Sequence, residues 1–191
     1  MRLGRTRLPI PPFDYDNEWG NQLIRAIDQN FDSAFANIEN SSATTGYYGS
    51  FYDTTTQTAA AANTAYAMTF NTTADSNQIA VVSSSRITFK NRGAYNIQFS
   101  AQVSQTSGSP HYVWIWMRKN GVDIPQSTGK IGIQSTKTES VPAWNFIVNV
   151  LGGDYIQIMW AVDDTAVRLL AEAATAFAPA IPSVIATAIA I

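Results

Sequence analysis

Cysteine is absent from the 191-residue sequence, and charged residues are scarce. Without cysteine the chain has no disulfides, no thiolate nucleophile and no cysteine-ligated metal site, and an oxidising extracellular origin is disfavoured. Charged residues make up 14% of the sequence, against about 25% in ordinary soluble domains, and the net charge is −2. Because no basic field is available to attract phosphates, neither nucleic acid nor an anionic membrane surface is expected as a partner.

Long apolar runs are missing as well. No stretch reaches the roughly 18 residues that a membrane-spanning helix needs, so no membrane association is expected. The opening residues 1–12, MRLGRTRLPIPP, are too polar and too rich in proline for a secretory signal peptide. The sequence therefore predicts a protein made in a cytoplasm.

Few residues could perform chemistry. The single histidine, His111, follows Pro110 at an expected loop end, and no nucleophile-elbow motif surrounds a serine, so a solvated loop histidine is predicted. Asp163 and Asp164 are adjacent and are predicted to form a turn rather than an acid/base or calcium site. We expect no enzyme activity, no catalytic residue, no cofactor and no metal.

The first 13 residues are predicted to form an extended arm, because three prolines within four positions favour a polyproline-like backbone. Such an arm cannot bury its apolar side chains on its own. We predict that it attaches the chain to a larger particle through Leu8, Pro9, Ile10, Pro11, Pro12 and Phe13.

A helix is predicted over residues 14–40, with Asp14 or Asp16 as its N-cap. Its apolar residues recur at the spacing of a narrow coiled-coil seam about two heptads long. This pattern suits either a short parallel bundle with copies of the chain or packing on the chain's own domain, and residues 41–46 then form a linker. The seam consists of Ile24, Ile27, Phe31 and Ile38.

From residue 47 to residue 191 the pattern indicates strands, which turn residues separate at regular intervals. About ten short antiparallel strands predict a jelly-roll sandwich. Residues 56–64 are expected to form a loop or extended connection, and residues 166–177 fit either a short helix or an irregular segment. The ten predicted strands are 49–54, 64–71, 78–83, 85–90, 93–104, 112–119, 129–135, 144–150, 154–162 and 183–191.

Two of these strands are apolar on both faces. In a sandwich one face of each sheet is normally wet, so a second apolar face needs a cover. We expect a neighbouring copy to provide it, and the alanines of the last strand would permit another layer to approach closely. The predicted trimer interface comprises Tyr112, Trp114, Trp116, Ile185, Ile189 and Ile191. For the strand tryptophans, packing in a core or interface is favoured over stacking on sugars.

Three stretches resemble the trimeric jelly rolls of the tumour necrosis factor and complement globular-head type. They are RITFKNRGAYNIQFSAQVS (86–104), WMRKNG (116–121) and VNVLGGDYIQIMW (148–160). The resemblance covers roughly residues 47–191 and implies a ten-strand jelly roll whose inner sheets pack around a threefold axis. Because the chain lacks cysteines and a signal peptide, the signalling roles of secreted members are not implied.

Other segments resemble jelly-roll modules in structural proteins of tailed bacteriophages, especially those of cyanobacterial and marine hosts. These segments are residues 49–73 and 179–191, together with the proline-rich arm and the start of the helix. The resemblance implies a homotrimeric virion protein that binds capsid or tail proteins of the same phage, either as a head decoration or cement protein or as a short fibre. The alternative is the tip of a tail fibre that binds a host receptor or surface glycan; a depolymerising tail spike is disfavoured by the low charge.

Overall fold

The chain divides into two compact units, residues 1–45 and residues 46–191. The structure is a computed structural model that describes residues 17–42, 46–135 and 138–191, and side chains of the helix at 18–33. In the first unit, helix α1 spans Asn17–Ser42 with Glu18 in its first turn. The carboxylate there complements the positive end of the helix dipole. The predicted arm and both candidate N-caps lie outside the described residues.

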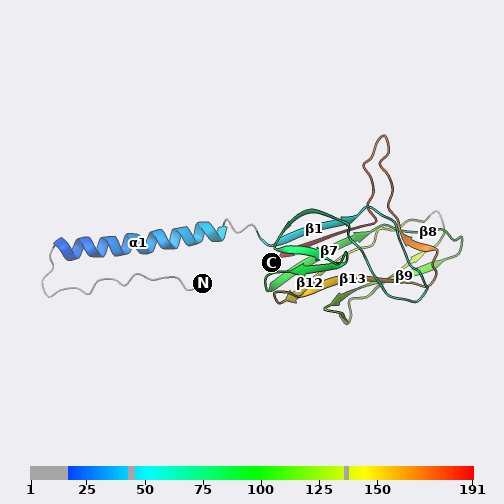
Figure 1. Ribbon diagram of the computed structural model, residues 1–191, viewed down its shortest axis with the longest axis horizontal. Coiled ribbons are helices and arrows are strands. Elements are labelled where there is room, and N and C mark those ends of the chain that lie inside the picture. Colours follow the sequence, from blue (N-terminus) through cyan, green and yellow to red (C-terminus); the bar gives the residue numbers. More distant parts are fainter. Residues whose placement is uncertain (1–16, 43–45, 136–137) are drawn as a thin grey trace. The chain divides into compact units, whose positions relative to one another are not determined.

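One layer of the second unit is a five-stranded antiparallel sheet in the order β12-β7-β15-β1-β4 (Figure 1). Strand β15 pairs with β7 on one side and β1 on the other, so segments far apart in the sequence form its centre. The strands are β1 (Tyr48–Asp53), β4 (Thr72–Asn77), β7 (Gly93–Ala101), β12 (Ala143–Val150) and β15 (Val184–Ala190).

The other layer is a seven-stranded antiparallel sheet with the path β10-β9-β13-β6-β5, to which β11 adds on β9 and β3 on β13. Its strands are β3 (Tyr66–Ala67), β5 (Ile79–Val82), β6 (Arg86–Phe89), β9 (His111–Lys119), β10 (Val122–Asp123), β11 (Gly129–Ile133) and β13 (Tyr155–Val162). A small third sheet consists of β2 (Gln57–Thr58), β14 (Val167–Leu169) and β8 (Val103–Gln105).

The core lies between the two large sheets, and strand alternation decides which side chains enter it. In β9 the inward residues Val113, Ile115 and Met117 are fully buried. In β15 the inward positions are Val184 and two alanines, also fully buried. The alanine face of this strand therefore packs against the chain's own second sheet. The expectation that another copy approaches these alanines is wrong.

The predicted mainly β, antiparallel jelly roll with one helix is confirmed. The strand predicted at 64–71 is wrong in extent, since only β3 forms there and the polar β4 follows it. Strand β4 escaped prediction because it pairs with β1 at the sheet edge and keeps most of its side chains in solvent. The ambiguous segment 166–177 contains β14 and no helix. The strands beyond the predicted ten are mostly two or three residues long, and most of them pair with strands that are distant in the sequence.

A polar network fixes the turn between β12 and β13. Asp154 accepts hydrogen bonds from the Leu151 backbone N–H at 2.8 Å and the Asn120 amide at 2.7 Å, and its carboxylate lies 2.8 Å from the Lys119 ammonium. These bonds, the Leu151 bond foremost, lower the pKa of Asp154 to about 2. The Asn120 Oδ1 in turn accepts from the Tyr155 N–H at 2.9 Å, so this network joins the β9–β10 turn to the start of β13.

Replacing Asp154 by asparagine should destabilise the protein at neutral pH because the charge-assisted bonds are lost. A lowered folded-state pKa contributes stability above the unfolded value near 3.8 and loses it as the pH falls toward 2. The difference in free energy of unfolding between wild type and D154N should therefore shrink from pH 5 to pH 2, as denaturant titrations at several pH values would measure. A difference that stays constant across this range would contradict the network.

Gly49 lies where β1 faces the core. A Cβ at this position would lie 2.5 Å from Cζ of Phe51, whose ring is fully buried. Gly49→Ala should thus lower the free energy of unfolding by about 1–3 kcal/mol through overpacking. The matched variant Gly108→Ala, where no atom lies within 4 Å, should leave stability within about 0.5 kcal/mol in the same urea titration. Equal stabilities of the two variants would contradict the packing of β1.

Candidate functional site

The outer side of strands β1, β7, β12 and β15 presents a broad surface without charged side chains, which we call the neutral face. Asp75 of the edge strand β4 borders it, and the Tyr48 hydroxyl donates to Asp75 Oδ2 at 3.2 Å. Its residues alternate with the buried positions of strands β1, β7, β12 and β15. Cross-strand pairs such as Ile189 with Tyr48 and Asn96 place them side by side. The neutral face consists of Tyr48, Ser50, Tyr52, Asn96, Gln98, Ser100, Ala143, Asn145, Ile147, Asn149, Ile185, Thr187 and Ile189.

The absence of charge is a property of the four strands as a whole. They contain one ionisable acid, Asp53, which points inward and is 2% exposed. Its carboxylate accepts hydrogen bonds from the Thr55 backbone and hydroxyl groups at 2.8 and 2.6 Å and from the Thr69 hydroxyl at 2.8 Å. A buried carboxylate with these partners belongs to the interior and adds nothing to the outer surface.

Large aliphatic side chains stand exposed on the neutral face. Ile185 is 39% exposed, Ile189 49% and Ile147 66%. Between them lie amides and hydroxyls, which can hydrogen-bond without any ion to desolvate. Neutral polar groups and exposed isoleucines are the composition expected at the centre of a protein interface.

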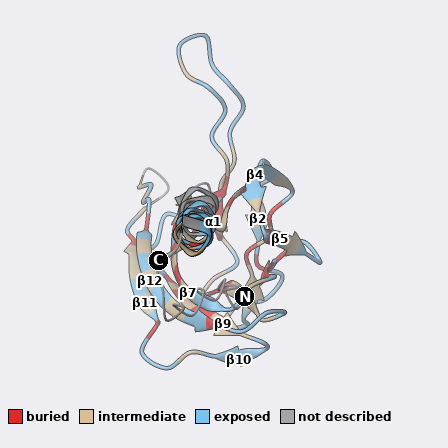
Figure 2. Ribbon diagram, turned by 90° about the vertical axis from the view of Figure 1, so that its left-hand side faces the viewer, coloured by how far each residue is buried: buried red, intermediate tan, exposed pale blue. Residues whose placement is uncertain are grey.

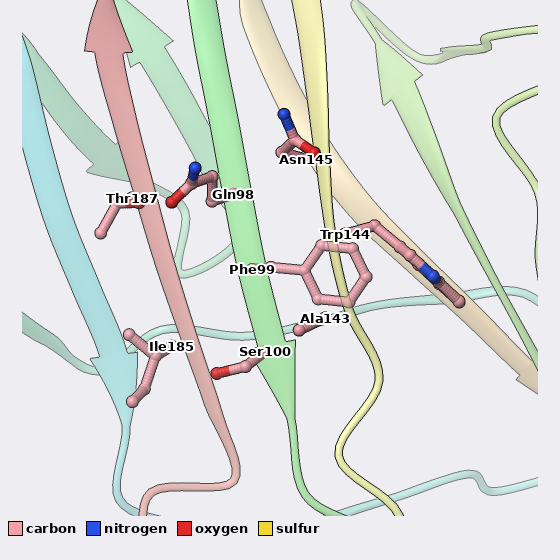
Figure 3. A pocket seen from close by; sticks show the side chains of 8 residues that line it. All are labelled: Gln98, Phe99, Ser100, Ala143, Trp144, Asn145, Ile185 and Thr187. Atoms are coloured by element: carbon pink, nitrogen blue, oxygen red, sulfur yellow. The ribbon is translucent and has the colours of Figure 1, made fainter.

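A shallow hollow of about 410 Å³ lies on the neutral face between β15, β7 and β12 (Figure 3). Its rim is formed by Gln98, Asn145 and Ile185, whose side chains come from three neighbouring strands. Its lining also includes Phe99 and Trp144, which pack edge to face with ring centroids 5.3 Å apart. The hollow thus combines an aromatic lining with neutral polar groups.

The opposite outer face, on the seven-stranded sheet, carries charged side chains, and these contact the aromatic side chains of the same face. Lys130 Nζ lies 3.7 Å from the ring centroid of Tyr112 and 5.1 Å from that of Trp114. The indole N–H of Trp116 donates to Asp123 Oδ1 at 2.8 Å, and Arg118 Nε donates to the same oxygen at 2.7 Å. Hydrogen bonds from Arg118 and Trp116 lower the pKa of Asp123.

The predicted trimer-interface residues therefore fall into two groups. Ile185 and Ile189 lie on the neutral face, whereas the three β9 aromatic residues lie on the opposite side of the sandwich. Because β9 and β15 face one shared core, their outward side chains point in opposite directions. Ile191 follows β15 and is 70% exposed. The sequence alone could not separate these two groups, because the lysine that lies over Tyr112 belongs to β11 and not to β9.

Three of the four residues of the predicted seam of α1 have described side chains, and each of these three is exposed. Ile24 is 59% exposed, Ile27 38% and Phe31 60%, while the side chain of Ile38 lies outside the described residues. The predicted attachment residues Leu8, Pro9, Ile10, Pro11, Pro12 and Phe13 are also outside them.

A long hairpin between β14 and β15 projects from the sandwich in Figures 1 and 2, and sequence analysis missed it. Backbone hydrogen bonds of 2.9 Å join Glu172 and Ile181 in both directions near its base, and a further bond from the Thr175 N–H to the Ala178 carbonyl forms its tip. Phe177 at the tip is 91% exposed. A hairpin this apolar is a second surface suited to contact with protein.

Of the ionisable groups noted in the sequence, Asp163 and Asp164 lie in the predicted turn, between β13 and β14, whereas the histidine does not lie in a loop. His111 begins β9, and its side chain is 16% exposed rather than solvated in a loop. Its ring nitrogens lie 3.6 Å from Asp163 and 3.9 Å from Asp164. Across the described residues there is no group of three or more histidine and acidic side chains arranged to hold a metal.

Comparisons with known proteins find likenesses among solved structures alone. No protein-family model and no curated protein matches the sequence. Among solved structures, the chain is similar to the globular domain of zebrafish complement 1qA protein, at 15% identity and a TM-score of 0.49 over 76% of this chain and 97% of that one. The jelly-roll assignment itself rests on the strand order. Within the described part of the chain, no helix has the length and apolarity needed to cross a membrane.

Proposed function

We propose that the protein is a homotrimeric, non-catalytic structural module whose subunits associate through the neutral face. The observation that carries this proposal is the contrast between the two outer faces. Exposed isoleucines occupy a surface without charged side chains on one side, and charged side chains contact the aromatic residues on the other. Burying the part of the neutral face on β7, β12 and β15, away from Asp75, removes apolar area from water with no charge to desolvate.

A single interface cannot use both predicted groups of residues. A sandwich that bound its neighbours through two opposite, roughly parallel faces would stack into an open array, because such contacts add no rotation that could close a ring. A threefold assembly closes when the neutral faces turn toward one axis. The interface is therefore assigned to Ile185, Ile189 and their neighbours, and the β9 aromatic residues are left facing outward.

Two further elements would strengthen such an assembly. The exposed seam of Ile24, Ile27 and Phe31 suits a short parallel bundle of three helices, a geometry in which apolar residues at this spacing pack together. The hairpin tip at Phe177 offers an apolar side chain to a neighbouring subunit. Several modest contacts on one assembly act together through their effective concentration.

Replacing Ile189 by aspartate should reduce the assembly to single chains, because the variant would bury an unpaired carboxylate. The matched control is Val82→Asp in β5, where the wild-type side chain is 48% exposed against 49% for Ile189. Light scattering coupled to size exclusion should give a mass near 20.8 kDa for I189D and three times that value for V82D.

Circular dichroism must show both variants folded, so that loss of assembly is separated from loss of the fold. A folded I189D protein that keeps the trimer mass would contradict the assignment of the neutral face. Dissociation of V82D alone would move the interface to the seven-stranded sheet.

The biological setting we propose is the particle of a tailed bacteriophage, as the resemblance of the arm and of segments 49–73 and 179–191 suggests. The chain would serve as a head decoration or cement protein or as a short fibre, made in the host cytoplasm and bound to capsid or tail proteins. Three arms on one trimer would give avidity, and proline rigidity would lower the entropy lost on binding.

Deleting residues 1–13 should abolish incorporation into phage particles while the shortened protein still assembles as a trimer. Immunoblots of purified particles from an infected host would measure incorporation. A gentler variant, with Leu8, Ile10 and Phe13 changed to serine, should have the same effect, since these side chains would fill the groove on the particle. Normal incorporation of both variants would refute attachment through the arm.

A further inference from the structure

A groove of about 590 Å³ crosses the outer face of the seven-stranded sheet, away from the neutral face. Ligand sites commonly have volumes of about 300–1,000 Å³ and few, well-placed polar groups. The floor is formed by Trp114 and Trp116, two positions apart on β9 and therefore on the same side of the sheet. The walls come from the segment 123–128 and from Asn63.

Hydrogen bonds hold the segment 123–128 in place beside β9. The Ile124 N–H donates to the Met117 carbonyl at 2.9 Å, and the Ser127 hydroxyl donates to the Ile124 carbonyl at 2.7 Å. The Met117 N–H donates to Ser127 Oγ at 3.0 Å. Asn63 is fixed across the groove by its backbone N–H, which donates to the Val162 carbonyl at 2.7 Å. The walls are thus preformed, so a ligand would not have to order them.

The indole of Trp116 is held by its edge. Its N–H donates to Asp123, and its ring stacks on no other ring or cation of the described residues. Since this side chain is half-buried, part of its ring still borders the groove. An indole fixed in this way offers an apolar surface of defined orientation.

Polar groups with spare hydrogen-bonding capacity surround this aromatic floor. Asp123 uses Oδ1 for both of its internal bonds, while Oδ2 accepts none from the described residues. The side chains of Asn63, Gln126 and Thr128 likewise have no hydrogen-bond partner in the described part of the chain. Gln126 and Asn63 hold positive φ angles of 58° and 56°, a strained backbone that often accompanies functional positions.

We propose that this groove binds the ring of a neutral hexopyranose, either as a free sugar or as a unit of a surface glycan. One face of such a ring carries C–H groups that pack on an indole, while its hydroxyl groups both donate and accept hydrogen bonds. A carboxylate oxygen accepts from hydroxyls, and carboxamides do both. The combination of Trp116, Asp123 Oδ2 and Gln126 meets these requirements together.

Among the described residues, the lining of the groove holds no cation that could pair with an anionic ligand. Asp123 is the one ionisable residue that lines it, and its lowered pKa keeps it negative at neutral pH. Arg118 lies 2.7 Å from this carboxylate and offsets its charge, so the groove has no electrostatic attraction for sialic acids, uronic acids or the phosphates of single-stranded nucleic acid. This site does not depend on the proposed trimer, because it lies on the other sheet.

The test uses the full chain labelled with ¹⁵N, in which the five tryptophans give separate indole N–H signals. Titration with methyl hexopyranosides and neutral oligosaccharides of two to six units should shift the signals of Trp116 and Trp114, assigned through W116F and W114F. Those of Trp144 and Trp160 should stay in place, since neither lines the groove. Affinity that rises with oligosaccharide length indicates a surface glycan, and constant affinity indicates a free sugar.

Variants separate binding from stability. Trp116→Ala should weaken binding at least about tenfold, whereas Trp116→Phe, which keeps an aromatic ring, should retain most of it. Asp123→Asn should weaken binding about tenfold, and Glu172→Gln on the projecting hairpin serves as its charge-matched control. Gln126→Gly is the sharpest variant, because glycine favours the positive φ. It should bind several-fold more weakly with a melting temperature at or above that of wild type.

The proposal is overturned if no neutral sugar moves the Trp116 signal at the highest soluble concentration. It is equally overturned if only acidic sugars or a single-stranded oligonucleotide move it, or if Q126G and D123N bind as tightly as wild type.

Discussion

The structure depends on one constraint: strand alternation lets two sheets share a single core, which leaves each sheet with one outer face. In β9 and β15, inward residues that pack in this core alternate with residues that face outward. The outward side chains contribute little to the core. We therefore infer what each outer face contacts from the chemistry of its side chains. One face is neutral and rich in isoleucine, and the other pairs its aromatic rings with ions.

Much of the fold could be predicted from the sequence because apolar alternation is strong in the central strands. Prediction failed where partners distant in the chain decide the structure. Edge strand β4 is polar and stays in place through its pairing with β1. The alanine-rich segment after β14 resembles a helix, yet it forms a hairpin whose ends are fixed by Glu172 and Ile181.

The candidate sites could be predicted only in part for the same reason. The aromatic character of β9 can be predicted from the sequence, but its contacts with Lys130 and Asp123 depend on the fold. The groove unites residues from four separate segments, and no local pattern connects Asn63 with Gln126. The two outer faces suit different tasks, one self-association and the other recognition. A trimer built on the neutral face would display three grooves at once, and weak binding at each would gain from avidity.

Hydroxyl-radical footprinting tests the central claim most directly, because it reports which side chains are covered in the assembled protein. Ile147 and Ile189 are 66% and 49% exposed in the single chain, close to Val122 at 71% and Val82 at 48% on the other sheet. If the neutral face is buried between subunits, both isoleucines should be oxidised several-fold more slowly than these valines. Equal oxidation of the two pairs would contradict the account.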